Sequence, residues 1–169
     1  MSRRAKDYSI KKYTMERIEA GSCRWHKTEL EKGSLQDARD NARNDINAIY
    51  ESGHLNEEER DKLYKLIEDI PESNTFIHQD FHPGNMMYQD GEIVLIDVED
   101  SGLGHPVLDL SSMYLVYVTA AKSGWAKKFG NLGKKEFAVI WDIIIRKYFD
   151  TEDKNEIKEI NRILKGYSG

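Results

Sequence analysis

The chain has 169 residues, of which 39% are hydrophobic and 33% charged, and its formal net charge is -5. That length suits one domain with a real core, and the composition excludes disordered and fibrous proteins. No window of about 18 uncharged apolar residues occurs and no hydrophobic signal segment follows the basic start, so we expect a cytoplasmic protein.

Four apolar residues at helical spacing predict a first helix over residues 8–26, which Gly21 should fray or end. They are Tyr8, Met15, Ile18 and Trp25. The chain's single cysteine, Cys23, lies in this segment and has no partner for an internal disulfide. We expect it to be a buried or half-buried small side chain.

Apolar residues at steps of three and four predict a second helix over residues 35–52, with Ser52-Gly53 as its stop. A third helix is predicted over residues 56–70. Asn56 is its expected N-cap, three glutamates follow at the positive helix end, and Pro71 ends it.

The pattern then changes to short apolar runs over residues 75–77, 86–88 and 93–96. Asp90-Gly91 between the last two runs predicts a β-hairpin. After Pro106 the helical period returns, and it predicts helices over residues 108–121, 135–149 and 153–166. The apolar stretch 113–118, Trp125 and Trp141 are expected in the core rather than in a substrate pocket. The predicted fold class is therefore α+β, mainly α-helical, with a small β-hairpin.

The two ends of the predicted hairpin carry the chemically distinctive residues. His78-Gln79-Asp80-Phe81-His82-Pro83-Gly84-Asn85 precedes it, and Ile96-Asp97-Val98-Glu99-Asp100 follows it. Pairing of the strands would bring Asp80, Asn85 and Asp97 together. Phosphoryl transfer needs such a set: one carboxylate for the attacking hydroxyl, and an amide and a carboxylate oxygen for Mg²⁺. This layout is that of the protein-kinase catalytic loop and metal-binding strand.

Residues 76–110 resemble the catalytic core of the aminoglycoside phosphotransferase and choline kinase family, a group with a protein-kinase-like fold. The family pattern is His-Gly-Asp-x-His-x-x-Asn, followed by Ile-Asp-(Trp/Phe)-x-x-Ala and Gly-(Asp/His)-Pro-x-x-Asp-Leu. In this chain Gln79 replaces the usual glycine and Val98 the usual aromatic residue, while Gly104-His105-Pro106-Val107-Leu108-Asp109-Leu110 matches the third motif.

The resemblance implies a role for each matched residue. Asp80 would be the catalytic base or the carboxylate that orients the acceptor, with His78 bracing the same catalytic loop. Asn85 and Asp97 would be ligands of the Mg²⁺ that accompanies ATP or GTP. Asp109 would open a helix and brace the loop. Contacts to the acceptor are assigned to His82, Glu99 and Asp100, for which turn residues or solvated turn carboxylates are the alternative.

Charge is distributed unevenly along the chain: the net charge is +4 over residues 1–33, -13 over 34–110 and +4 over 111–169. The acidic middle segment repels nucleic acid and favours a cationic substrate or a divalent metal. The resemblance implies a small-molecule hydroxyl acceptor, which this charge would favour in cationic form, and we expect no membrane partner. Solvated helix faces explain most of these carboxylates.

Residues 1–169 are predicted to form a single kinase-like C-terminal lobe, with helices over 1–75, the catalytic loop and hairpin over 76–100 and helices over 101–169. The 75 residues before the catalytic loop contain no Gly-rich loop after a strand and no Val-Ala-Ile-Lys-like run. We therefore expect the N-terminal β lobe to be absent, the chain to be inactive alone, and the open face to promote self-association.

Two further interpretations remain. A metallohydrolase could use His78, Asp80, His82 and Asp97 as ligands, although such a site has no need of Asn85. A degenerate kinase-like lobe could instead act as a binding or regulatory module, and it would lack metal and nucleotide binding.

Overall fold

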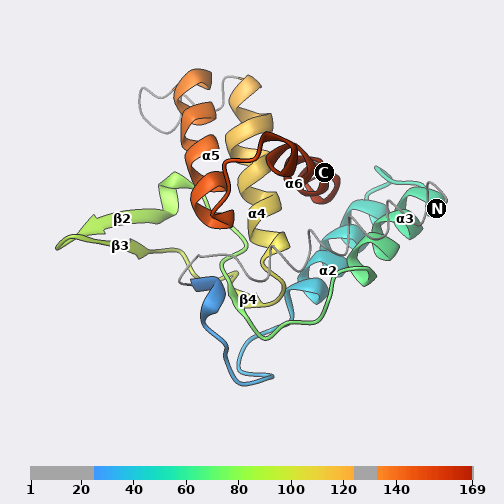
Figure 1. The fold of residues 1–169 in the computed structure, drawn as a ribbon. Helices are drawn as coiled ribbons and strands as arrows, with labels where there is room; N and C mark the ends of the chain where they lie inside the picture. Colours follow the sequence, from blue (N-terminus) through green and yellow to red (C-terminus); the bar gives the residue numbers. More distant parts are fainter. Residues whose placement is uncertain (1–24, 124–132, 169) are drawn as a thin grey trace, which may run out of the picture.

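The computed structural model describes residues 25–123 and 133–168, and in this part the fold is mainly helical with two small antiparallel sheets (Figure 1). The predicted α+β class is therefore confirmed. Among these residues, no helix is both long and apolar enough to cross a bilayer. Most of the predicted first helix, with Cys23, and also Trp125 lie outside the described residues.

The described chain starts with a short 3₁₀-helix, η1 (Trp25–Lys27), and not with the end of an α-helix. Within η1 the buried side chain is His26, whereas Trp25 is only partly buried. The predicted helix therefore does not continue through Trp25, and the side chain that faces inward is His26, whose ring contacts Asp109 and Tyr148.

The next two helices pack against each other as an antiparallel pair (Figure 1). Helix α2 (Ala38–Glu51) begins later than predicted, because Asp37 is its N-cap and accepts a hydrogen bond from Arg39 N at 2.9 Å. Helix α3 (Glu57–Glu68) has the predicted N-cap, since Asn56 Oδ1 accepts from Glu59 N and Asn56 N donates to Glu59 Oε2.

The predicted hairpin is confirmed as β2 (Met86–Gln89) paired with β3 (Glu92–Leu95). Asp90 and Gly91 form its turn, both with positive φ, which a two-residue hairpin turn favours. The run before it forms β1 (Phe76–Ile77), which pairs with β4 (Gly102–Leu103) in a separate sheet. A short 3₁₀-helix, η2 (Pro83–Asn85), leads into β2.

Helices α4 (Val107–Tyr114), α5 (Lys134–Phe149) and α6 (Lys154–Tyr167), with the continuation of α4, form what we call the helical body. That continuation is not α-helical, in contrast to the predicted helix over 108–121: η3 (Leu115–Thr119) is a π-helix and η4 (Ala120–Ser123) is a 3₁₀-helix. The core of the body lies where α4 meets α6 and η3 meets α5. Trp141 is buried there, as predicted, and so are Met113, Val116 and Tyr117 of the apolar stretch 113–118, whereas Leu115 is 43% exposed.

Candidate active site

The side-chain amide of Asn85 joins the two ends of the loop that precedes the hairpin. Asn85 Nδ2 donates to the main-chain oxygen of Asp80 and to Asp80 Oδ2, each at 3.0 Å. Asn85 is buried, whereas the Asp80 side chain is 50% exposed. Its amide oxygen, Oδ1, has no hydrogen bond with the described residues, so it remains available to a ligand.

Asp97 follows directly after the point where the hairpin is bonded to this loop. Ile96 N donates to Asn85 O at 3.0 Å, and His78 Nε2 donates to Ile96 O at 3.0 Å. The Asp97 backbone has a φ of 59°, a left-handed conformation that Asp adopts more readily than most residues. Its exposed carboxylate has no hydrogen-bond partner among the described residues.

The two histidines of the loop differ in their surroundings. His78 is 1% exposed, and its ring meets Phe81 edge-on at 6.0 Å between centroids. His82 is partly exposed: its Nδ1 accepts from Gly84 N at 3.0 Å, and its Nε2 lies 3.4 Å from Asp80 Oδ2. His78 therefore holds the backbone of the hairpin, while His82 stabilises the turn and faces Asp80.

The buried carboxylate of Asp109, in the first turn of α4, holds the start of the loop. Its Oδ2 accepts from His78 N at 2.9 Å and its Oδ1 accepts from Gln79 N at 2.6 Å. Oδ2 also lies 3.0 Å from His26 Nε2, and His26 Nδ1 lies 2.9 Å from the hydroxyl of Tyr148. A continuous chain of hydrogen bonds thus runs from α5 through η1 and α4 to the loop.

The sequence alone does not identify His26 and Tyr148 as residues of the site. Neither belongs to a local motif, and their contact joins residues separated by 122 positions. The sequence pattern gives no indication of this contact, because Tyr148 fits the pattern of an apolar helix face.

Gln79 occupies a backbone position that explains the glycine of the family pattern. Its φ is 67°, in the left-handed region where a side chain costs about 1–2 kcal/mol. An interaction that glycine could not make offsets this cost, since Gln79 Nε2 donates to the main-chain oxygen of Asp100. The substitution therefore ties the loop to the segment that follows Asp97.

A cavity of about 640 Å³, within the usual range for small-molecule sites, opens beside Asp80. Its lining is rich in carboxylates and amides from the loop, from the segment after Asp97 and from α2. The lining residues are Leu35, Gln36, Asn41, Asn44, Asp45, Gln79, Asp80, Glu99, Asp100 and Ser101.

The structure thus brings three of the predicted site residues, Asp80, Glu99 and Asp100, to one cavity. His82, Asn85 and Asp97 are not part of its lining. The α2 residues were missed because polar positions on a helix normally face solvent. The one available signal is that Asn41, Asn44 and Asp45 share a face at steps of three and four.

The alternative metal cluster of His78, Asp80, His82 and Asp97 is not formed. No group of three or more His, Cys, Asp or Glu side chains is placed to hold a metal ion in residues 25–123 and 133–168. The ring of His78 explains part of this result, since it is buried and its Nε2 is used by Ile96 O.

The sequence model of the phosphotransferase enzyme family, APH, matches residues 14–139. The chain belongs to this phosphotransferase family. The search of curated proteins found no match, and neither did the search of solved structures. The match to the phosphotransferase family includes the loop, the hairpin and Asp109 and ends within α5, so Tyr148 and α6 lie beyond it.

Proposed function

We propose that the chain provides the catalytic and acceptor-binding part of a small-molecule kinase, which transfers the γ-phosphoryl group of ATP or GTP to a hydroxyl. The single observation that carries the proposal is the pair of hydrogen bonds from Asn85 Nδ2 to Asp80. They orient the Asp80 carboxylate at the acidic cavity and leave the Asn85 amide oxygen free for a cation.

In this proposal Asp80 accepts the proton of the acceptor hydroxyl. The acceptor oxygen forms a bond to the γ-phosphorus, the bond from that phosphorus to the bridging oxygen breaks, and the nucleoside diphosphate leaves. His78, Gln79 and Asp109 hold the backbone on which Asp80 is positioned.

Asn85 Oδ1 and the carboxylate of Asp97 would hold Mg²⁺. An amide and a carboxylate oxygen suit this cation, which keeps its remaining sites for phosphate oxygens and water. When bound, Mg²⁺ neutralises charge on the phosphates. A metal site made by the protein alone would have more than two protein ligands. Two are expected here because phosphate oxygens of the nucleotide supply further ligands.

The acceptor class follows from the cavity beside Asp80. Asp45, Glu99 and Asp100 line it together with two asparagines of α2, and none of the described residues in its lining is Lys or Arg. An acceptor that bears amino groups would have carboxylates to pair with there, whereas an anionic one would be repelled. We therefore propose an amine-bearing hydroxyl compound, with Glu99 and Asp100 among its contacts and His82 facing Asp80 from the other side.

A second lobe would complete the nucleotide site. Ile93, Val94 and Val98 are exposed on and after β3, and together with Trp25 and Phe76 they line a cavity of about 490 Å³. In the chain alone, we propose that this apolar surface promotes self-association and that nucleotide affinity and turnover are low.

The test uses Mn²⁺ in place of Mg²⁺, with ATP, on the 169-residue chain, both at millimolar concentrations that compensate for the low nucleotide affinity of the chain alone. We expect paramagnetic broadening of the Asn85 side-chain NH₂ signal in NMR spectra, and loss of that broadening in Asp97→Asn. Glu92→Gln removes a carboxylate from β3, the strand that precedes Asp97, and is the matched control, which should behave as the parent. Unchanged broadening in Asp97→Asn would overturn the metal assignment, and no metal effect at all would favour the non-catalytic binding module.

Kinetic and binding measurements on an active assembly with a nucleotide lobe distinguish the roles of Asp80 and Asp97. Asp80→Asn should lower kcat by orders of magnitude with nearly unchanged nucleotide affinity, whereas Asp97→Ala should also weaken nucleotide binding. Amine-bearing and neutral polyols should differ as acceptors, and Asp100→Asn should reduce that difference. Equal effects of Asp80→Asn and Asp97→Ala on binding would contradict the assigned roles.

A further inference from the structure

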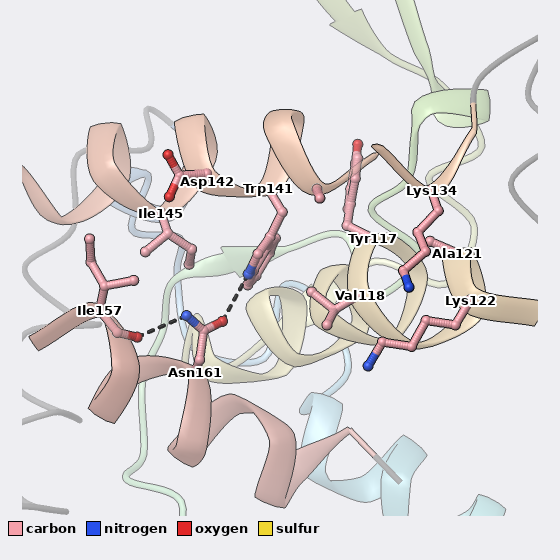
Figure 2. Close-up of a pocket in the computed structure, with 11 residues that line it drawn as sticks. Tyr117, Val118, Ala121, Lys122, Lys134, Trp141, Asp142, Ile145, Ile157 and Asn161 are labelled. Atoms are coloured by element: carbon pink, nitrogen blue, oxygen red, sulfur yellow. Dashed lines mark hydrogen bonds between the residues drawn. The ribbon is translucent and has the colours of Figure 1, made fainter. Parts of the chain in front are cut away.

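A second cavity, of about 230 Å³, lies between η3, η4, α5 and α6 (Figure 2). Its walls include Tyr117 and Val118 from η3, Trp141 and Ile145 from α5, and Ile157 and Asn161 from α6. No residue of this lining belongs to the cavity beside Asp80. It is therefore a separate candidate binding site.

The wall of this cavity suits a flat apolar group. Trp141 Nε1 donates to Asn161 Oδ1 at 2.8 Å, and Asn161 Nδ2 donates to Ile157 O at 2.8 Å, as the dashed lines in Figure 2 mark. These polar atoms are satisfied within the wall and need no ligand. The ring of Trp141 stacks on that of Tyr117, with 6.3 Å between centroids and 22° between planes.

The rim of the cavity is positively charged. Lys122 and Lys134 belong to its lining, and Figure 2 shows both side chains reaching toward Val118. Neither lysine has an ion-pair partner in the part of the chain that the structure describes. The acidic member of the lining, Asp142, has its carboxylate bound by Arg146 Nε at 2.7 Å.

The π-helical turn coincides with this cavity. A π-turn is a costly insertion in a helix, and such turns occur frequently at functional sites. Here η3 supplies Tyr117 and Val118 to the wall. The irregular turn thus contributes to the shape of the cavity, and the core of the body accommodates it.

We propose that this cavity binds a small carboxylate with a single aromatic ring, with the ring against Trp141 and Val118 and the carboxylate between Lys122 and Lys134. A cavity of about 150 Å³ can hold benzene, so the volume suits one ring and a short chain. The proposal does not depend on the phosphotransfer chemistry proposed for the first cavity.

Three probes that differ only in their polar group test this proposal on the full chain: 3-phenylpropionate, 3-phenylpropanol and 3-phenylpropylamine. Binding is followed by NMR through the indole N–H of Trp141, assigned with Trp141→Phe. We expect the carboxylate to bind about fivefold more tightly than the alcohol, the amine to bind most weakly, and added salt to reduce the preference.

Matched variants identify the groups responsible. In the double variant Lys122→Gln/Lys134→Gln, the affinity for the carboxylate should fall to within about twofold of the affinity for the alcohol. The affinity for the alcohol should stay unchanged. Lys158→Gln, an exposed charge on α6 outside the lining, should behave as the parent. Ala138→Phe, at the edge of the cavity, should abolish binding of all three, with the fold verified from the remaining spectrum.

Equal affinities for the three probes, a carboxylate preference that persists in the double variant, or binding that survives Ala138→Phe would each overturn the proposal. So would the absence of any shift of the Trp141 signal at about 20 mM 3-phenylpropionate, since affinities of small fragments lie in the millimolar range.

Discussion

In the helical body, Leu110, Phe137 and Leu164 are completely buried, whereas on the β2–β3 hairpin Tyr88 is 75% exposed and Ile93 49% exposed. Both regions use large apolar residues, but only the body encloses them between packed helices (Figure 1). A two-stranded hairpin with exposed faces has little stability of its own. Its position therefore depends on the few bonds that join it to the loop, above all those of Ile96 with Asn85 and His78.

The two regions therefore differ in what they contribute to the protein. The body supplies the free energy of folding, and the hairpin with its loop presents the candidate catalytic groups. Asp109 connects the two, because it belongs to α4 and binds the backbone of the loop.

The largest expected difference comes from one substitution made in both regions. Ile160→Ala, at a buried position of α6, should lower the free energy of unfolding by about 3–4 kcal/mol through lost burial and the cavity it leaves. Ile93→Ala, at the exposed face of β3, should cost less than about 1 kcal/mol. Chemical denaturation of both variants measures this. Equal costs would mean that the hairpin is packed against something in solution.

The contact between β4 and the residues that precede α2 gives the second effect. A Cβ at Gly102 would lie 2.7 Å from the main-chain oxygen of Gln36, so Gly102→Ala should cost about 1–3 kcal/mol and shift the wall of the acidic cavity. Gly166→Ala in α6 meets nothing within 4 Å and should be neutral or stabilise by up to about 1 kcal/mol. Thermal unfolding distinguishes the two, and a tolerated Gly102→Ala would show that this contact relaxes freely.

Local signals in the sequence account for the elements that were predicted correctly. Asn56 and Glu59 form the capping box of α3, and Asp90-Gly91 forms the hairpin turn. In each case the residues that determine the structure lie within a few positions of one another. The helix over 135–149 was also predicted within one residue, since its apolar stripe meets the core along its whole length.

Structure that depends on distant contacts could not be predicted in this way. The π-turn in η3 interrupts a run whose apolar pattern predicts one continuous helix. Strand β4 depends on its pairing with β1, which is distant in the sequence. The same holds within the candidate site. The contact of Asp80 with Asn85 spans five positions and belongs to a motif, whereas the contribution of α2 to the cavity depends on tertiary packing.

The hydrogen-bond chain from the body to the loop gives the third effect. Tyr148→Phe removes the hydroxyl that meets His26 Nδ1 in the interior and should cost about 1–2 kcal/mol. Tyr88→Phe, on the exposed hairpin, should change stability by less than about 0.5 kcal/mol.

Hydrogen exchange gives a second readout for Tyr148→Phe. The amides of His78 and Gln79, which donate to Asp109, should exchange faster in this variant if His26 transmits the change. A loss of stability with unchanged protection of these two amides would show that the chain of hydrogen bonds stabilises α5 without holding the loop.

The smallest expected effect concerns Asp37, the N-cap of α2 beside the acidic cavity. Its hydrogen bond with the Arg39 guanidinium lowers the pKa of the Asp37 carboxyl below its ordinary value, although partial burial opposes this. A carboxyl whose pKa is lower in the folded state stabilises the fold above its unfolded-state pKa, and that contribution is lost as the pH falls through the folded value. Asp37→Ala should therefore cost about 1 kcal/mol near neutral pH and less below about pH 4.

Asp37→Asn separates the cap from the charge in that experiment. Asn can still accept the bond from Arg39 N, so the variant should retain most of the capping contribution and lose the pH dependence. Urea denaturation of the parent and both variants across this pH range measures the two parts. If the cost of Asp37→Ala stays constant down to about pH 2, the neutral carboxyl caps α2 as well as the carboxylate does. The ion pair between Asp37, whose side chain is 38% exposed, and Arg39 would then add nothing to the stability of the fold.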